Sequence, residues 1–321
     1  MRAPLRNTLL TAWRKRWRRL FKFSSTQHVY EIKGVKVGGQ PGQYPTVMIG
    51  SIFYHGHKIV EDEKTGAFDK KAAEELLNAE AGLSDRLGNP RMVDVVGSFP
   101  EAIVNYIDYV VDAVDSPFLI DGTTASVRIT GLKHAKEIGA IDRAVYNSLT
   151  MEAKEEEIAA IKDSKIKTAI LLTLNSRNPT LQGRMEALES LLKLAKEAGI
   201  EQYLVDTTVF DIPDPGVCAK ACYLEKEKYG YPAGCGAHNA VDRWRQIKKL
   251  EPNVKLIATT VANVVPIALG ADFMLYGPID HAPDAYEMCA IADAYVSYSM
   301  SQEFRIRPES PAHPIKRVFR R

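Results

Sequence analysis

The chain has 321 residues, of which 45% are hydrophobic, 26% charged and 8% aromatic, a composition typical of a soluble globular domain with one large core. No apolar run is long enough to span a bilayer, so any membrane association is expected to be peripheral. The net charge of +2 is uneven, because residues 1–19 carry seven basic and no acidic side chains while the rest holds 35 basic and 40 acidic ones. This mildly acidic body argues against a nucleic-acid-binding surface.

Residues 1–22 are predicted to form a basic amphipathic extension outside the main domain, which would occupy residues 23–321. Apolar residues recur there at helical spacing between Arg and Lys: Leu9, Leu10, Trp13, Trp17, Leu20 and Phe21. The segment could be an interfacial anchor, a partner-binding arm, or a disordered extension or upstream translation artefact. It lacks the uninterrupted apolar stretch and the cleavage site of a secretory signal.

Gly-rich residues 34–43 precede the first strand instead of following one, so they predict a hairpin at the bottom of a barrel and not a phosphate loop. From residue 46 onward, short apolar runs alternate with amphipathic stretches, which is typical of a parallel sheet covered by helices. The predicted strands are 46–53, 92–96, 117–121, 143–147, 168–174, 202–206, 233–237 and 271–276. Eight such units predict a single (β/α)8 TIM barrel of the α/β class.

Predicted helices lie between these strands, at 69–82, 99–113, 152–162 and 182–198, with Gly199 as the C′ residue of the last. Residues 255–259 could compete as a further strand, although we expect them to lead into a helix at 260–269. Cys218 and Cys222 are four residues apart on a further expected helix and would face the same way. With no pattern that supplies two more ligands, we expect no metal site.

Polar residues follow the apolar strands at the positions that open onto one face of a parallel barrel. They are Asp94, Asp121, Asn147, Asn175, Asp206, His238 and Asn239. Carboxylates at the ends of buried strands are costly unless they are paired or functional, so their convergence predicts a site for a polar ligand. The alternative for Asp121 and Asn147 is that each caps a following helix. His238 is equally consistent with a structural role.

Six segments together resemble the family of the H subunit of tetrahydromethanopterin S-methyltransferase, from about residue 20 to the C-terminus. They are VGGQPGQYPTVMIGSIFYHGHKIV (37–60), FLIDGTTASVRITGL (118–132), YNSLTME (146–152), YLVDTTVFD (203–211), GCGAHNA (234–240) and FMLYGPIDHA (273–282). Residues 1–19 depart from the family pattern. The strand ends are also similar to the wider pterin-binding corrinoid methyltransferases, so the resemblance implies a pterin-binding barrel.

The resemblance implies pterin-binding roles for Asp94, Asp121, Asn147, Asp206 and Asn239. Asp206 or Asp121 would accept hydrogen bonds from N3–H and the 2-amino group of the pterin. Asn239, with a water and a nearby carboxylate, would assist at N5, and we expect Asn239 and Asp206 to carry catalysis. The sequence identifies no buried acid of raised pKa. Thr124 departs from the wider pattern, which has an Asn there that contacts the pterin.

The reaction implied by the resemblance moves the N5-methyl group of methyl-tetrahydromethanopterin to a cob(I)alamin-type corrinoid. No Asp-x-His-x-x-Gly motif is present, so this corrinoid (cobamide) would be carried by a partner subunit and the chain itself would bind no cofactor. The partners implied are that subunit and the membrane subunits of a sodium-translocating methyltransferase complex of methanogenesis, with a homodimer also allowed. The chain would be cytoplasmic and peripheral to the membrane, and coenzyme M would react elsewhere.

Two other functions are compatible with the residues. One is a free-standing methyltransferase between a corrinoid protein and tetrahydrofolate, serving the demethylation of a methylated amine. The other is a non-catalytic scaffold subunit, against which the polar strand ends argue because a scaffold does not need them. The sequence therefore predicts a pterin-dependent methyltransferase, with the choice of pterin open.

Overall fold

The computed structural model describes residues 21–210 and 213–319, so the predicted N-terminal helix lies outside the described residues except at its last two positions. Eight parallel strands close into a barrel in the order β10-β11-β12-β3-β6-β7-β8-β9. They are β3 (Val47–Ile52), β6 (Arg91–Gly97), β7 (Phe118–Gly122), β8 (Ala144–Leu149), β9 (Thr168–Leu172), β10 (Gln202–Asp206), β11 (Ala233–Cys235) and β12 (Phe273–Pro278). The predicted barrel and its eight strands are confirmed.

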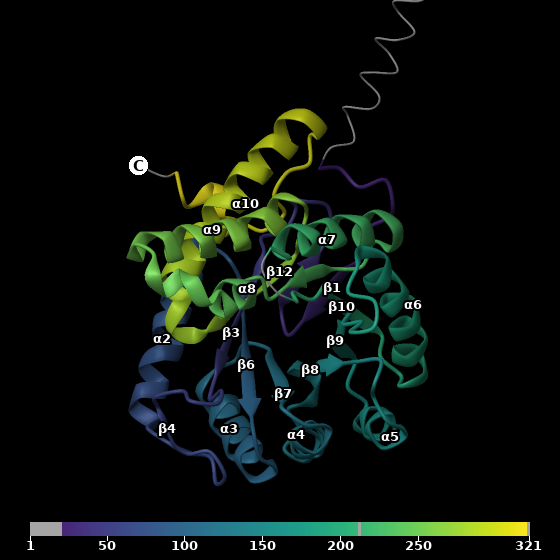
Figure 1. Cartoon of the computed structure of the whole chain (residues 1–321), viewed down its shortest axis with the longest axis vertical. Coiled ribbons are helices and arrows are strands. Elements are labelled where there is room, and N and C mark those ends of the chain that lie inside the picture. Colours follow the sequence, from purple (N-terminus) through teal and green to yellow (C-terminus); the bar gives the residue numbers. More distant parts are fainter. Residues whose placement is uncertain (1–20, 211–212, 320–321) are drawn as a thin grey trace, which may run out of the picture.

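Helices surround this barrel (Figure 1). They are α2 (Lys70–Leu87), α3 (Pro100–Ala113), α4 (Ala125–Glu137), α5 (Glu155–Ser164), α6 (Leu181–Glu197), α7 (Pro215–Tyr229), α8 (His238–Arg243), α9 (Pro252–Ala268) and α10 (Ala282–Phe304). Residues 255–259 belong to α9, so the helix expected at 260–269 begins eight residues earlier and no strand competes there. No range was predicted from the sequence for α4, α8 or α10.

The helix termini follow local sequence signals. Thr180 caps α6 by accepting a hydrogen bond from the backbone N–H of Gly183, and the chain leaves the helix through Gly199 at a φ of 81°. The predicted C′ role of Gly199 is confirmed. Because glycine has no Cβ, it adopts this left-handed conformation without the steric cost that other residues bear.

An antiparallel hairpin closes the bottom of the barrel, as predicted. Strand β1 (Val29–Ile32) pairs with β2 (Val35–Gly38), and the turn passes through Gly34 at a φ of 83°. Ile32 and Val37 are buried against the interior-facing layer of the barrel, whose members include Ile49 and Phe273. Polar side chains line the opposite end of the barrel, where the carboxyl ends of the strands lie.

Two further apolar layers lie between the sheet and the helices. One packs α2 to α6 mainly against β6 to β10, and the other packs the end of α2 and α7 to α10 mainly against the remaining strands. Within the described residues, none of the helices combines the length and apolar character needed to cross a membrane. The small hairpin of β4 (Val60–Asp62) and β5 (Ala67–Phe68) follows β3 at the mouth.

Candidate functional site

The predicted site residues on the strands all point into the barrel interior, at the same level. Side chains alternate between the two faces of a strand, so a residue two positions after an interior residue also faces the interior. The interior residues Met92, Leu119, Val145 and Leu204 form one apolar layer. The residues two positions later are Asp94, Asp121, Asn147 and Asp206. The same alternation that buries the apolar layer therefore stacks a polar layer directly above it, toward the carboxyl ends of the strands.

Three of these residues are in direct contact. The Nδ2 group of Asn147 donates to Oδ1 of Asp94 at 3.1 Å and to Oδ2 of Asp121 at 3.4 Å. Ser51 on β3 donates from its hydroxyl to Oδ2 of Asp94 at 2.7 Å. Four neighbouring strands thus contribute to one hydrogen-bonded cluster. Ser51 was not singled out from the sequence, although it lies two positions after the interior residue Ile49 and so obeys the same alternation.

The two carboxyl groups of this cluster resist ionisation. Burial raises the pKa of Asp94 to about 6, against the hydrogen bonds from Ser51 and Asn147, which lower it. Burial also raises the pKa of Asp121 well above its ordinary value, and the neighbouring charge of Asp94 raises it further. A pair of carboxyl groups joined by one amide therefore retains a proton more readily than exposed aspartates do.

Asp206 ends β10 in the same polar layer and has its own environment. Its Oδ1 accepts a hydrogen bond from the backbone N–H of Thr208 at 2.8 Å. Burial raises its pKa to about 7, with the bond from Thr208 opposing the rise. The sequence identified no acid of raised pKa, and this expectation is wrong for three carboxyl groups. The cause is burial by residues distant in the sequence, which a local motif does not display.

Arg184 holds the loop that follows Asp206, and sequence reasoning missed it. The Arg184 side chain is fully buried and donates from Nε to the carbonyl of Thr207 at 2.9 Å and from Nη2 to the carbonyl of Thr208 at 3.3 Å. It also forms an ion pair with Asp214, which accepts from the backbone N–H of Phe210 at 2.7 Å. The sequence feature that could have identified Arg184 as buried is its position on the apolar face of α6, on the same side of the helix as Leu188 and Leu191.

A second buried acid lies behind this loop. Glu225 on α7 is 1% exposed, and neither of its carboxyl oxygens has a hydrogen-bond partner among the described residues. Burial raises its pKa well above the ordinary value, and the charges of Cys218 and Asp206 act in the same direction. A neutral carboxyl at this position adds no negative charge beneath Asp206.

Asn239 and His238 begin the short helix α8 after β11. The side chain of Asn239 is exposed. The backbone of Gly236 lies close to it, since a Cβ added at Gly236 would be 2.9 Å from Nδ2 of Asn239. His238 is hydrogen-bonded through Nδ1 to the carbonyl of Leu275 at 2.9 Å and packs against Gly277. Asn239 is therefore free to reach a ligand, whereas His238 has the contacts of a structural residue.

The helix-cap alternative fails for both residues to which it applied. Thr124, not Asp121, caps α4 by accepting from the backbone N–H of Val127 at 3.4 Å. No helix begins next to Asn147, because α5 starts at Glu155. Asn175, by contrast, serves its own loop, since its side chain bonds Asn178 N–H and the Gly183 carbonyl.

Across the barrel mouth, the segments that follow β3 and β12 contribute a second group of polar residues that the sequence did not indicate. His57 is 3% exposed, and its Nδ1 accepts from the backbone N–H of Phe53 at 3.1 Å, so a neutral ring carries its proton on Nε2. That nitrogen lies 3.3 Å from Oδ2 of Asp280, and Tyr54 stacks on the ring. Burial lowers the pKa of His57 against the opposing effect of Asp280.

The cysteines do face the same way, as their spacing predicted. The sulfur atoms of Cys218 and Cys222 lie 3.0 Å and 3.2 Å from Oγ1 of Thr207. Over residues 21–210 and 213–319, no group of three or more His, Cys, Asp or Glu side chains is arranged to hold a metal ion. These thiols pack with Cys235 among buried residues behind β10.

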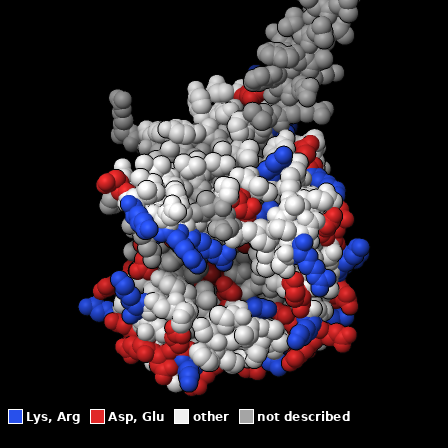
Figure 2. All heavy atoms as spheres, in the orientation of Figure 1, with Lys and Arg blue, Asp and Glu red and all other residues white. Residues whose placement is uncertain are grey.

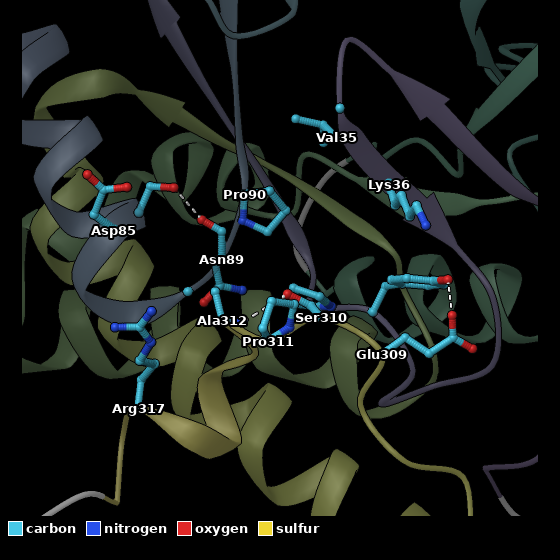
Figure 3. A pocket seen from close by; sticks show the side chains of 15 residues that line it. Val35, Lys36, Asp85, Asn89, Pro90, Glu309, Ser310, Pro311, Ala312 and Arg317 are labelled. Atoms are coloured by element: carbon cyan, nitrogen blue, oxygen red, sulfur yellow. Dashed lines mark hydrogen bonds between the residues drawn. The ribbon is translucent and has the colours of Figure 1, made fainter.

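A cavity of about 460 Å³ lies at the other end of the barrel, beside the bottom hairpin. Figure 3 shows Lys36 and Glu309 on one side of it and Asp85 and Arg317 on the other. None of the predicted site residues lines it. Because catalysis in such barrels occurs at the carboxyl ends of the strands, the polar layer is the stronger candidate for the functional site.

Comparisons with known proteins identify the family of the chain and the type of fold. The model of the family described as tetrahydromethanopterin S-methyltransferase MtrH subunit matches residues 25–308. The H subunit of tetrahydromethanopterin S-methyltransferase from Methanothermobacter thermautotrophicus is 42% identical over 290 residues, which are 87% of this chain and 94% of that protein. The H subunit of the putative mtx methyltransferase of Methanosarcina mazei is 39% identical over 308 residues, 92% and 99% of the two chains.

Among solved structures, dihydropteroate synthase of Yersinia pestis in a sulfonamide drug complex superposes with a TM-score of 0.60. The match covers 84% of this chain and 100% of that one, at 14% sequence identity. At this identity the likeness concerns the fold alone. It agrees with the closed eight-stranded barrel seen in this chain.

Proposed function

The chain belongs to the family of tetrahydromethanopterin S-methyltransferase MtrH subunits, and from this premise we propose that it transfers the N5-methyl group of methyl-tetrahydromethanopterin. The acceptor in this proposal is a cob(I)alamin-type corrinoid on a partner subunit. The chain would act in the sodium-translocating methyltransferase complex, as a peripheral subunit on the cytoplasmic side. The observation that carries the proposal is the polar layer of Asp94, Asp121, Asn147 and Asp206 at the active end of the barrel.

Recognition of the pterin follows from the chemistry of its pyrimidine edge. N3–H and the 2-amino group are two parallel donors, which match the two oxygens of one carboxylate. Asp206 and Asp121 are the residues proposed for this role. Burial keeps the pKa of Asp206 at about 7. Two donors from the ligand would favour the ionised form, so binding of the pterin is expected to release a proton near neutral pH.

The transfer requires a proton at N5. When the methyl group leaves, the electron pair of the broken C–N bond stays on N5, and without a proton or a strong hydrogen bond this nitrogen is a poor leaving group. The corrinoid supplies the nucleophile when it is bound. The chain supplies Asn239, which is exposed at the mouth, and the raised-pKa pair Asp94 and Asp121, which can hold a proton nearby. We propose that Asn239 positions a water that relays this proton.

The test compares two methylated pterins with the purified chain and free cob(I)alamin under reducing conditions. We expect methyl-tetrahydromethanopterin to bind and lose its methyl group. Asp206→Asn and Asn239→Ala should lower kcat/KM by roughly 10²-fold, as loss of a positioned acid–base or polar group does. Asp142→Asn, on the exposed turn before β8, is the matched control and should change nothing. Folded variants with wild-type rates would show that the site assignment is wrong.

Methyl-tetrahydrofolate as the methyl donor is the second candidate, because the mtx relative is nearly as similar to this chain as the tetrahydromethanopterin-linked one. The name of the mtx relative assigns a methyltransferase without stating a pterin. The same residues would bind either pterin. Faster demethylation of methyl-tetrahydrofolate than of methyl-tetrahydromethanopterin would favour this candidate. No demethylation of either pterin would leave the scaffold function as the explanation.

A further inference from the structure

An apolar groove lies next to the mouth of the barrel, between the N-terminus of α7, helix α8 and helix α9. It has a volume of about 430 Å³. The lining side chains are almost all apolar: Pro213, Pro215, Gly216, Ala240, Val241, Trp244, Ala258, Val261, Ala262 and Val265. Burial of such a surface is favourable, and a groove of this kind between helices is the usual seat of an amphipathic helix from a partner.

Helix α9, which forms one wall of the groove, has the composition of a covered helix. Lys255 is the only charged residue in its 17 positions. Yet Leu256, Ile257 and Val261 are 47%, 56% and 55% exposed. A helix that is apolar on nearly all sides is normally buried, and exposed apolar patches of this kind mark interaction sites. The outer face of α9 therefore lacks a partner within the described part of the chain.

Basic side chains surround this groove. Arg243, Arg245, Lys249 and Lys255 are exposed on α8, on the 3-10 helix η2 (Arg245–Lys249) and on the first turn of α9. Lys255 is paired with Asp242 of α8 at 3.4 Å, which leaves an excess of basic side chains here. Figure 2 shows a band of Lys and Arg at this place, beside a hollow in the same face. We call these four residues the basic rim. Outside residues 1–19 acids outnumber bases by 40 to 35, so the rim contrasts with the rest of the surface.

The groove is connected to the candidate active site through one loop and one helix. The loop after Asp206 leads to Pro213 and α7, and Arg243 donates to the carbonyl of Phe210 in that loop at 2.8 Å. Helix α8, which forms another wall, begins with His238 and Asn239. A protein bound in the groove would therefore lie beside the mouth, in contact with elements that carry Asp206 and Asn239.

We propose that this groove and its basic rim are the docking site for the corrinoid-carrying partner. The occupant is an amphipathic helix of that partner, with apolar side chains toward α9 and acidic side chains toward the rim. This inference rests on the proposed function, which requires a corrinoid protein to reach the mouth. A second copy of the chain is the competing occupant, and the ultracentrifuge measurement below distinguishes it from the corrinoid-carrying partner.

Two exposed substitutions test the docking site without touching the catalytic layer. The Arg245→Glu/Lys249→Glu double variant reverses the rim, and Val261→Asp places a charge in the groove. The matched control is Lys193→Glu/Lys196→Glu, two exposed positions near the end of α6 at the other end of the barrel. The partner is the purified corrinoid-carrying subunit, and its affinity is measured by titration calorimetry with the full chain.

We expect both groove variants to weaken binding of the corrinoid subunit at least tenfold and to raise its KM as methyl acceptor. Their kcat with free cob(I)alamin should stay at the wild-type value, and the control should bind normally. Unchanged affinity in both groove variants would overturn the proposal, as would a loss of dimer mass in the ultracentrifuge with unchanged affinity for the corrinoid subunit. The binding measurement needs no methyl transfer. Failure of the proposed function would appear separately, as inactivity of the wild type with free cob(I)alamin, and is therefore distinguishable from failure of the docking proposal.

Discussion

Asp94, Asp121 and Asn147 depend on one another in a way that single residues do not reveal. The amide of Asn147 donates to both carboxyl groups, and each of those groups has a raised pKa because it is buried. The donor partly compensates for the desolvation of two acids at once. At the residue scale the site is therefore a small network whose properties change when any member is replaced.

Substitution of Asn147 should affect ligand binding, while substitution of another strand-end asparagine should not. In Asn147→Ala the two carboxyl groups lose their shared donor, so we expect the affinity for the pterin to fall roughly tenfold or more. Asn175→Ala removes only bonds within its own loop and should cost stability, about 1 kcal/mol, with unchanged affinity. Titration calorimetry and urea denaturation of both variants separate the two effects. Equal losses of affinity would contradict the distinction.

At the scale of the element, the start of α4 shows that a polar residue after a strand can either face the barrel interior or cap the next helix. Asp121 lies near the end of β7, and Thr124 stands at the N-cap of the helix that follows. The strand therefore delivers Asp121 to the barrel interior, while the cap is supplied three residues later. The bond to the backbone N–H of Val127 therefore gives Thr124 a structural role at the start of α4.

Thr124→Ala is expected to weaken α4 without weakening pterin binding. Loss of an N-cap hydroxyl costs about 1 kcal/mol of unfolding free energy. Thr123→Ala, the exposed neighbour with only a 3.5 Å bond to the Ser98 carbonyl, is the matched control and should cost less. The measurement is the urea midpoint of each variant together with its pterin dissociation constant. A tenfold weaker pterin complex in Thr124→Ala would return this residue to the ligand site.

The pH dependence of stability belongs to the whole molecule, because burial by the complete barrel causes it. Burial sets the pKa values of Asp94 and Asp206 at about 6 and about 7, against 3.8 for an ordinary aspartate. Both groups are neutral in the folded and unfolded states well below pH 4. As the pH rises above 4, the unfolded chain releases these protons before the folded chain does. The free energy of unfolding therefore falls with rising pH until the folded groups have ionised as well, at about pH 6 to 7.

We expect Asp206→Asn to remove the larger of these two contributions. The asparagine does not ionise, so the difference in unfolding free energy between variant and wild type should grow in favour of the variant from pH 5 to pH 8. A shift of about three pKa units corresponds to on the order of 4 kcal/mol at most. Melting temperatures of both proteins across this range, measured without added pterin, provide the test. A difference that stays constant with pH would mean that Asp206 is already ionised at pH 5.

The sequence by itself determined the barrel, its eight strands and the polar residues of the layer at their ends. These features are periodic and local: apolar runs form the strands, and the twofold alternation of side chains assigns Asp94 and Asp206 to the interior. The C′ glycine of α6 and the bottom hairpin are local in the same sense. The early start of α9 was missed, because the short run 255–259, with Leu256, Ile257 and Ala258 at its centre, suits a strand as well as a helix.

Only the tertiary structure decided what environment each polar residue has. It separated Asn147, which bridges two carboxyl groups, from Asn175, which bonds its own loop. It also buried Arg184 beneath the loop after Asp206 and left the apolar face of α9 exposed. These properties depend on atoms brought together from distant segments, and burial, not residue type, sets the pKa values of the site. A local sequence pattern specifies where a side chain points, and the folded chain specifies what that side chain meets.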